Sequence, residues 1–421
     1  MRPWALPLGA PCENSAAAAA RLSDYTRSDP KDICVVTETY PPEVNGVALT
    51  LRHLVEGLTS RGHRVSLVRP RQAGGFSPSA QPKTIEVKGL PLPGYKGLQL
   101  GLPASARLLH CWTQTAPDVV YVATEGPLGW SAVRTARRLG IPIVSGFHTN
   151  FDRYAKHYGL GCLQRLVFGY LRRFHNRTAA TLTATADLRE ALLRHGFRNL
   201  TVVSRGVDSD LFSPERRSRK LRRQWGLGDD DLAVVYVGRV APEKNLELAV
   251  AAYRKMTQSC RSLRFVIVGD GPSRSNLERK HADLIFCGTQ TGEALAQHFA
   301  SADMFLFPSE SETFGNVTLE AMASGLAVVA YDYAAARIHI VDRQTGLLAP
   351  YRDQSAFIDA ASSLARTPQL LNLVRNGARE YVAKVGWQRV IDDFEAALAV
   401  AQTRTPQPAA RFRARRGLAA T

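Results

Sequence analysis

The 421-residue sequence contains no apolar run near the roughly 20 residues that a membrane-spanning helix requires. Its first 30 residues include an alanine run, but they lack the basic start, sustained apolar stretch and cleavage site of a secretion signal. With 45% hydrophobic and 22% charged residues, the composition is that of a globular protein. We therefore expect a cytoplasmic protein with a disordered extension at residues 1–30.

The sequence is also short of metal-binding and disulfide patterns. The six cysteines stand singly, without a CxxC pair, and no His, Cys and Asp cluster has the spacing of a metal site. An acidic run at residues 229–231 precedes a strand-like segment, so we interpret it as a solvated turn. The sequence predicts a reducing environment, no required metal ion and no cofactor.

Acidic residues are few relative to basic ones, since 37 Asp and Glu face 54 Lys and Arg for a net charge of +17. A good share of the excess lies in residues 403–421, which hold five arginines and no acid and are predicted to be a disordered tail. A second concentration at residues 163–178 alternates apolar and arginine residues at helical spacing. That segment suits peripheral contact with an anionic membrane on its inner face, or an ordinary helix with a basic solvent face.

Short apolar, β-branched runs alternate with helical stretches in two successive series. Near-continuous apolar strands of this kind indicate parallel sheets covered by helices on both faces. A polar, proline-containing segment after residue 205 separates the series, so we expect one domain over residues 31–205 and a second over 206–384. Ligands bind beyond the carboxyl ends of parallel strands, which directs attention to the strand-to-helix loops.

One such loop follows the strand DMFLFPS and leads into a helix that ends near Gly325. Gly315 permits close approach of a ligand to the backbone, and the amides of a helix start can bind an anionic diphosphate. Glu312 in the loop and Glu320 in the helix can accept hydrogen bonds from hydroxyl groups. Alternatively, two acids near a helix start can have no other role than a favourable interaction with the helix dipole.

Two further loops carry candidate residues. After LAVVYVGRV, the cations Arg239 and Lys244 could stabilise a diphosphate leaving group, although surface cations in loops are commonplace. After IPIVSGFHT, His148 could act as an acid, a base or a hydroxyl ligand, or be structural. The first strand is followed by Gly46 in a turn into a helix, and the absence of GxGxxG there argues against a dinucleotide fingerprint.

Taken together, these motifs resemble retaining glycosyltransferases of the GT-B fold in glycosyltransferase family 4, over roughly residues 32 to 400. Glu312 and Glu320 stand as the Glu-x7-Glu motif within TFGNVTLEAMASG, and residues 238–245 resemble the GR-x4-KN motif. The stretch HTNFDRYAKHYGLG and Arg205 in the hinge-like SRGVDSDLF are similar to the GDP-mannose-dependent alpha-mannosyltransferase subgroup.

The resemblance implies an α/β fold of two facing Rossmann-like domains with a cleft between them, and a helix at residues 385–402 that crosses back to the acceptor-side N-terminal domain. It implies that Glu312 contacts the donor sugar, Glu320 the ribose, and Arg239 with Lys244 the phosphates, and that His148 contacts the sugar. Catalytic work is expected of Glu312, His148, Arg239 and Lys244. The other donor-binding residues are expected to be Gly46, Arg205, Asp270, Phe314, Gly315, Asn316, Val317 and Glu320.

The implied reaction is transfer of a hexosyl group, first of all mannosyl from GDP-mannose, to a hydroxyl of a glycolipid or polysaccharide precursor. UDP-glucose or UDP-glucuronate as donor stays open, as does a sugar-nucleotide epimerase on the same fold. The alternative outside enzymes is a basic protein that binds membranes or nucleic acid. Such a protein would have no reason to carry both glutamates with Arg239 and Lys244, so we expect no nucleic-acid partner.

Overall fold

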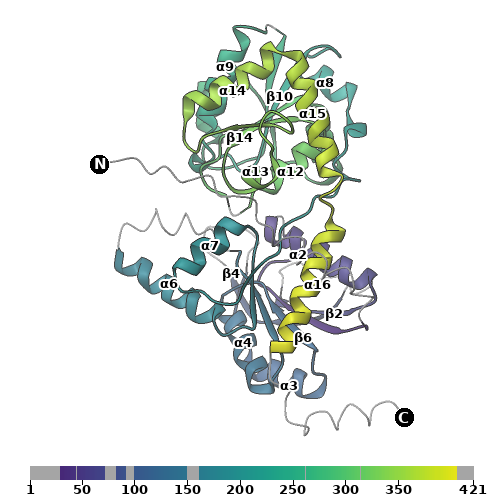
Figure 1. The fold of residues 1–421 in the computed structure, drawn as a ribbon, viewed down its shortest axis with the longest axis vertical. Helices are drawn as coiled ribbons and strands as arrows, with labels where there is room; N and C mark the ends of the chain where they lie inside the picture. Colours follow the sequence, from purple (N-terminus) through teal and green to yellow (C-terminus); the bar gives the residue numbers. More distant parts are fainter. Residues whose placement is uncertain are drawn as a thin grey trace, which may run out of the picture.

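The computed structural model describes residues 29–404 apart from residues 44, 72–81, 92–98, 149–160, 261 and 313. Nearly all of the predicted extension at 1–30 and of the predicted tail at 403–421 lies outside the described residues. The described chain forms two lobes, one above the other in Figure 1, and each is built on a parallel sheet with helices on both faces. The predicted α/β class with two Rossmann-like sheets is confirmed.

The N-terminal sheet has the strand order β3-β2-β1-β6-β7-β8-β9, with every neighbouring pair parallel. The order reverses between β1 and β6, which is where open α/β sheets bind ligands. The strands are β1 (Asp32–Val36), β2 (Arg64–Pro70), β3 (Lys83–Val87), β6 (Val119–Val122), β7 (Ile143–Gly146), β8 (Ala180–Thr183) and β9 (Leu200–Val202). A separate antiparallel ribbon pairs β4 (Gly89–Pro91) with β5 (Gln99–Gly101).

The helices described within this lobe are α2 (Gly46–Ser60), α3 (Ser105–Gln114), α4 (Pro127–Leu139), α6 (Gly161–His175) and α7 (Ala186–Arg194). The first of them begins at the cleft because Asn45 caps it, its side-chain oxygen accepting hydrogen bonds from the amides of Val47 at 3.1 Å and Ala48 at 2.9 Å. The Asn45 amide group in turn donates to the Thr39 hydroxyl at 2.7 Å, which ties the helix start to the loop after β1.

The C-terminal sheet has the order β12-β11-β10-β13-β14-β15, again entirely parallel. Its strands are β10 (Leu232–Val237), β11 (Leu263–Val268), β12 (Ile285–Gly288), β13 (Met304–Phe307), β14 (Ala327–Tyr331) and β15 (Leu347–Ala349). Its helices are α8 (Arg219–Gln224), α9 (Leu246–Thr257), α10 (Arg274–Lys280), α11 (Gly292–Ala300), α12 (Asn316–Ala323), α13 (Ala334–His339), α14 (Gln354–Arg366) and α15 (Pro368–Val382), with short 3-10 turns η1 (Pro214–Arg216) and η2 (Pro242–Lys244).

The last helix, α16 (Trp387–Arg404), leaves the C-terminal lobe and packs on the N-terminal one (Figure 1). Its buried Ile391 and Phe394 belong to the same apolar cluster as the core of the N-terminal sheet. A Cβ atom on Gly57 of α2 would lie 2.1 Å from Ile391 Cδ1, so the absence of a side chain there lets the two helices approach. None of the described helices combines the length and the apolar composition that a membrane span requires.

The two connections between the lobes run side by side. Val207, in the connection from the N-terminal to the C-terminal lobe, forms an isolated parallel bridge with Gly386, in the connection that returns to α16. A Cβ atom on Gly206 would lie 2.9 Å from the backbone of Trp387, so a larger residue would push the two segments apart. Any movement of one lobe relative to the other therefore requires these two paired segments to bend together.

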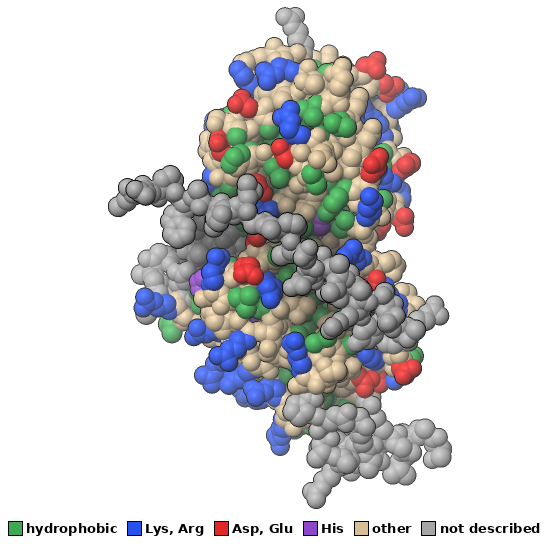
Figure 2. All heavy atoms as spheres, in the orientation of Figure 1, with side chains coloured by type: hydrophobic (Ala, Val, Ile, Leu, Met, Phe, Trp, Pro, Cys, Tyr) green, Lys and Arg blue, Asp and Glu red, His purple; other side chains and the backbone are tan. Residues whose placement is uncertain are grey.

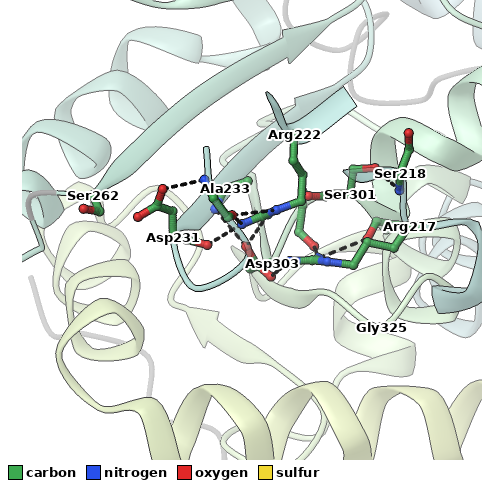
Figure 3. Close-up of polar contacts among 12 residues, drawn as sticks. Arg217, Ser218, Arg222, Asp231, Ala233, Ser262, Ser301, Asp303 and Gly325 are labelled. Atoms are coloured by element: carbon green, nitrogen blue, oxygen red, sulfur yellow. Dashed lines mark hydrogen bonds and ion pairs between the residues drawn. The ribbon is translucent and has the colours of Figure 1, made fainter. Parts of the chain in front are cut away.

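At the amino end of the C-terminal sheet, away from the cleft, Asp303 gathers three arginines (Figure 3). Arg222 of α8 lies 3.2 Å, Arg217 3.1 Å and Arg375 of α15 3.4 Å from its carboxylate, which also accepts the Ala233 amide of β10 at 2.8 Å. The side chain of Asp303 is 4% exposed and that of Arg222 is 1% exposed. One buried acid thus holds α8, α15 and the sheet together.

Replacement of this acid should strongly destabilise the C-terminal lobe. Asp303→Asn leaves the buried Arg222 and the half-buried Arg217 and Arg375 without their counter-charge, and breaking a buried ion pair costs about 3–5 kcal/mol. We expect a large fall in the urea midpoint, measured by circular dichroism. The exposed Asp229→Asn is the control, and equal midpoints for the two variants would contradict the structural role of Asp303.

Candidate functional site

A cavity of about 460 Å³ lies between the lobes, at the carboxyl ends of β10 and β13 and the start of α2. Nine of the residues singled out in the sequence line it: Gly46, Arg205, Arg239, Lys244, Glu312, Phe314, Gly315, Asn316 and Val317. Further lining residues that sequence reasoning missed are Asn45, Val47, Val237, Gly238, Glu243, Phe307 and Ser311. Most of these adjoin the predicted ones, and Val237 and Phe307 are the last residues of strands β10 and β13.

Lys244 and Glu312 form an ion pair at the wall of the cavity. Lys244 Nζ also donates to the carbonyl of Ser311 at 3.0 Å and to the hydroxyl of Ser309 at 3.3 Å. The two side chains are 14% and 13% exposed, so most of each is shielded from solvent while the cavity side stays accessible. The loop after β10 and the loop after β13 thus meet through residues from the two predicted motifs.

Arg239 behaves differently from Lys244. Its side chain is 49% exposed, and its nearest carboxylate, that of Glu243, lies 3.8 Å away. An exposed pair at this distance is weak. The guanidinium therefore has freedom to turn toward an anion in the cavity.

Glycines let the loop after β10 pack against the loop after β11. Gly269 has φ +141°, and a Cβ atom there would lie 1.9 Å from the Gly238 carbonyl oxygen. The Asp270 carbonyl accepts the Val240 amide at 2.9 Å. The Asp270 carboxylate, however, accepts the neighbouring Gly271 amide at 2.7 Å and lies 3.5 Å from Arg274, and it is not among the described lining of the cavity.

The start of α12 faces the cavity with its backbone. Gly315 precedes the helix with φ +96°, a left-handed conformation that favours glycine, and no described side chain caps the helix. The first amides of α12 are consequently available to an anion. The Asn316 side-chain oxygen is buried without a hydrogen-bond partner among the described residues.

Arg205 is a buried cation at the contact between the lobes. It donates to the Thr50 hydroxyl at 2.8 Å and to the Gly46 carbonyl at 3.1 Å, and its guanidinium carbon lies 5.7 Å from the centre of the Phe314 ring. Burial lowers the pKa of Arg205 to about 10, so it stays charged at neutral pH. It forms no ion pair with an acid in the described part of the chain, so an anion in the cavity would supply the missing counter-charge.

His148 reaches the cavity only through Arg205. Arg205 Nη2 lies 3.4 Å from His148 Nδ1, and His148 Nε2 lies 2.9 Å from the Tyr121 hydroxyl. Burial, with repulsion from Arg205 second, lowers the pKa of His148 to about 3. Because a guanidinium can only donate, Nδ1 accepts and the single proton resides on Nε2. His148 is thus neutral and is not among the described residues that line the cavity.

Glu320 lies on α12, outside the described lining of the cavity. Burial raises the pKa of its carboxyl to about 7, and no described side chain donates a hydrogen bond to it. The structure thus separates the two motif glutamates, since Glu312 is paired with Lys244 and Glu320 has no cation beside it among the described residues. The roles predicted for all of the site residues, those that line the cavity included, stay predictions.

No group of three or more His, Cys, Asp or Glu side chains suited to a metal ion occurs among the described residues. The described cavity lining is instead rich in cations and backbone amides, an arrangement suited to a phosphate-bearing ligand.

Two family models match the chain, Glycosyltransferase Family 4 over residues 44–211 and Glycosyl transferases group 1 over residues 231–367. A GDP-mannose-dependent alpha-mannosyltransferase of Mycolicibacterium smegmatis is 34% identical over 86% of this chain and 95% of its own. The alpha-monoglucosyldiacylglycerol synthase of Streptococcus pneumoniae is 26% identical over 75% of this chain and 74% of its own. The crystal structure of Anabaena Alr3699/HepE in complex with UDP has a TM-score of 0.69 at 17% identity and covers 87% of this chain and 99% of that one, a likeness of fold.

The raised pKa of Glu320 predicts a pH-dependent effect on stability. The folded state favours its protonated form, so its contribution is greatest below pH 4.5 and is lost as the pH rises toward 7. Glu320→Gln removes this dependence. We expect the melting temperature of the variant, relative to the parent, to rise by a few degrees between pH 5 and pH 8 in scanning fluorimetry.

The exposed Glu190→Gln serves as the matched control and should show no such trend. A difference between Glu320→Gln and the parent that is the same at both pH values would contradict a buried, protonated Glu320.

Proposed function

Because the chain belongs to glycosyltransferase family 4, has the GT-B fold and transfers a sugar from a nucleotide sugar, we propose that it moves mannosyl from GDP-mannose to a hydroxyl group with retained configuration. The observation that carries the donor site is the Lys244–Glu312 pair at a cavity which Arg205 and the start of α12 also line. The choice of GDP-mannose draws its support from the mannosyltransferase at 34% identity.

Each wall of the cavity has a role in this proposal. Arg239 and Lys244 hold the diphosphate, which the α12 amides contact through hydrogen bonds. Glu312 accepts hydrogen bonds from the sugar hydroxyls once Lys244 turns from it toward phosphate, and Glu320, behind the described lining on α12, accepts them from the ribose. Arg205 adds a preorganised positive charge that needs no reorientation.

The reaction we propose proceeds on one face of the sugar. The bond between the anomeric carbon and the leaving phosphate oxygen breaks, and the acceptor oxygen forms its bond on the same face. The proton of the acceptor hydroxyl passes to a phosphate oxygen of the departing diphosphate. The neutral His148, whose Nδ1 lone pair accepts from Arg205, is placed to orient that guanidinium rather than to take the proton.

The acceptor we propose is a glycolipid or polysaccharide precursor presented at the inner face of a membrane. The similarity to a synthase whose name specifies a diacylglycerol lipid supports a lipid, and the same similarity keeps a glucosyl donor such as UDP-glucose as the second candidate. UDP-glucuronate and an epimerase reaction on this fold are further alternatives. An epimerase would convert the donor to an isomer of equal mass without an acceptor.

The donor is tested with a panel of GDP-mannose, UDP-glucose and UDP-glucuronate, read by mass spectrometry as donor hydrolysis and nucleoside diphosphate release. We expect the fastest turnover with GDP-mannose and an α-configured product by NMR. No turnover of GDP-mannose would exclude it as the donor. Isomerisation of the donor detected by NMR, without diphosphate release in mass spectrometry, would replace the transferase by an epimerase.

The ion pair is tested with Lys244→Ala and Glu312→Gln. Each removes a group directed at the donor, so kcat/KM should fall on the order of a hundredfold or more, as for other preorganised electrostatic groups. Lys280→Ala, at an exposed pair with Glu247, is the control and should retain the parent rate. Unchanged kcat/KM in both site variants would overturn the mechanism.

Arg205 is tested through the affinity for the nucleoside diphosphate alone. Arg205→Gln keeps hydrogen-bonding capacity but removes the buried charge, and hydrogen bonds to charged groups are worth about 1.5–3 kcal/mol. We expect the Kd of GDP in calorimetry to rise about tenfold to a hundredfold. The exposed Arg198→Gln should bind like the parent, and an equal Kd for Arg205→Gln would show that Arg205 does not face the phosphates.

A further inference from the structure

A groove of about 650 Å³ lies between α4 and α6 on the flank of the N-terminal lobe, and five arginines line it. Figure 2 shows Lys and Arg side chains gathered at the lower left of the molecule, where Figure 1 places these helices. The arginines are Arg134, Arg137 and Arg138 of α4, Arg173 of α6, and Arg177 in the turn after α6. None of them lines the cavity between the lobes, so the groove is a separate feature.

The spacing on each helix brings these side chains to one face. Leu166, Tyr170 and Arg173 follow one another on α6 at intervals of four and three residues, which is one face of a helix, and Arg177 lies in the turn just beyond its end. Leu166 is 66% and Tyr170 44% exposed, so this face carries apolar surface next to the arginines. The same face therefore offers both an apolar residue and cations to a partner.

The groove holds positive charge that the protein leaves uncompensated. Its lining contains no acid, and no described residue forms an ion pair with any of the five arginines. Arg177 packs instead over the Trp130 ring, 5.2 Å from its centre. Burial, and then repulsion from Arg173 and Arg137, lowers the pKa of Arg177. The arginines thus repel one another in the free protein, and a bound anion would reduce this repulsion.

A second depression of about 470 Å³ continues the groove. It shares Arg137 and Arg177 with the first and adds Arg404 at the end of α16. The positive surface is therefore extended, which suits an array of anions better than one small ion.

We propose that this groove binds the phosphate headgroups of anionic membrane lipids, with Leu166 and Tyr170 entering the membrane interface beside them. Guanidinium groups match phosphate in geometry and charge, and tyrosine with an apolar neighbour is suited to the boundary between headgroups and acyl chains. The exposed Leu166 favours a lipid surface over a nucleic acid, which would supply phosphates but no apolar layer. Lipid binding at this groove is independent of which nucleotide sugar the cavity between the lobes binds.

The test is co-sedimentation of the full chain with vesicles of 30% phosphatidylglycerol and 70% phosphatidylcholine, against vesicles of phosphatidylcholine alone. The groove variant is Arg134→Gln/Arg137→Gln/Arg173→Gln. Since each cation near an anionic surface contributes roughly a fivefold gain in binding, we expect the three changes to weaken binding on the order of a hundredfold. Leu166→Ser should weaken it several-fold without changing the net charge.

The control variant, Arg107→Gln/Arg223→Gln/Arg279→Gln, loses the same charge at exposed positions outside the groove and should bind vesicles within about twofold of the parent. Equal losses in the two triple variants would mean that total charge alone attracts the protein, and would overturn the site. So would vesicle binding by the groove variant at the parent level.

Further measurements distinguish a lipid from other ligands of the groove, and distinguish loss of membrane binding from loss of donor turnover. Inorganic phosphate at millimolar concentration should not release the parent from vesicles, and release would indicate a site for the free ion. A single-stranded RNA that binds through the groove while vesicles do not would identify a nucleic acid instead. Donor hydrolysis should be unchanged in the groove variant, so a loss of vesicle binding is distinguishable from a failure of the proposed transferase activity.

Discussion

The geometry of the site depends on how the two lobes are joined. Two connections cross between them side by side, bridged at Val207 and Gly386 and in contact at Gly206, so the lobes share a narrow, paired junction. The returning helix α16 then packs into the core of the N-terminal lobe. Because both sheets are parallel, this junction makes the start of α2 face the loops after β10 and β13. Domain closure around a ligand would bend the same paired segments.

Within that geometry, the electrostatics favour an anion before any ligand arrives. Arg205 is charged and buried beside the helix start at Gly46, Lys244 is paired with Glu312, and the α12 amides have no capping side chain among the described residues. The neighbouring His148 is held neutral by burial and by Arg205. Charge placed in this way lowers the stability of the free protein and gains a favourable interaction when a phosphate binds. Preorganised sites stabilise a leaving group in this manner. The arginine groove between α4 and α6 repeats the pattern at a second place, with no acid to balance it.

Much of the fold could be predicted because local sequence carries it. Buried parallel strands appear as continuous apolar runs, and the motif residues around Glu312 and Lys244 stand at strand-to-helix loops that must share one edge of a sheet. The positions of side chains relative to the cavity were less predictable. Glu320 and Asp270 belong to loops or helices beside the site, yet the first lies outside the described lining and the second turns to its own Gly271 amide. Whether a side chain points into the cavity changes within one turn of a helix, and the spacing of residues in the sequence does not resolve this.

By itself, the sequence determined the α/β class, the two parallel sheets, the family and the loops from which a donor site is built, since hydrophobic periodicity and glycine-containing turns are local properties. Only the tertiary structure decided that Lys244 pairs with Glu312, that Arg205 is buried between the lobes without an acid among the described residues, and that arginines of α4 and α6 converge on one groove. The Lys244–Glu312 pair joins residues 68 positions apart, and Arg205 contacts Gly46 from 159 positions away. The physical reason is that charge, burial and pKa depend on which distant groups the packed core brings within a few ångströms, and this is set by the whole fold.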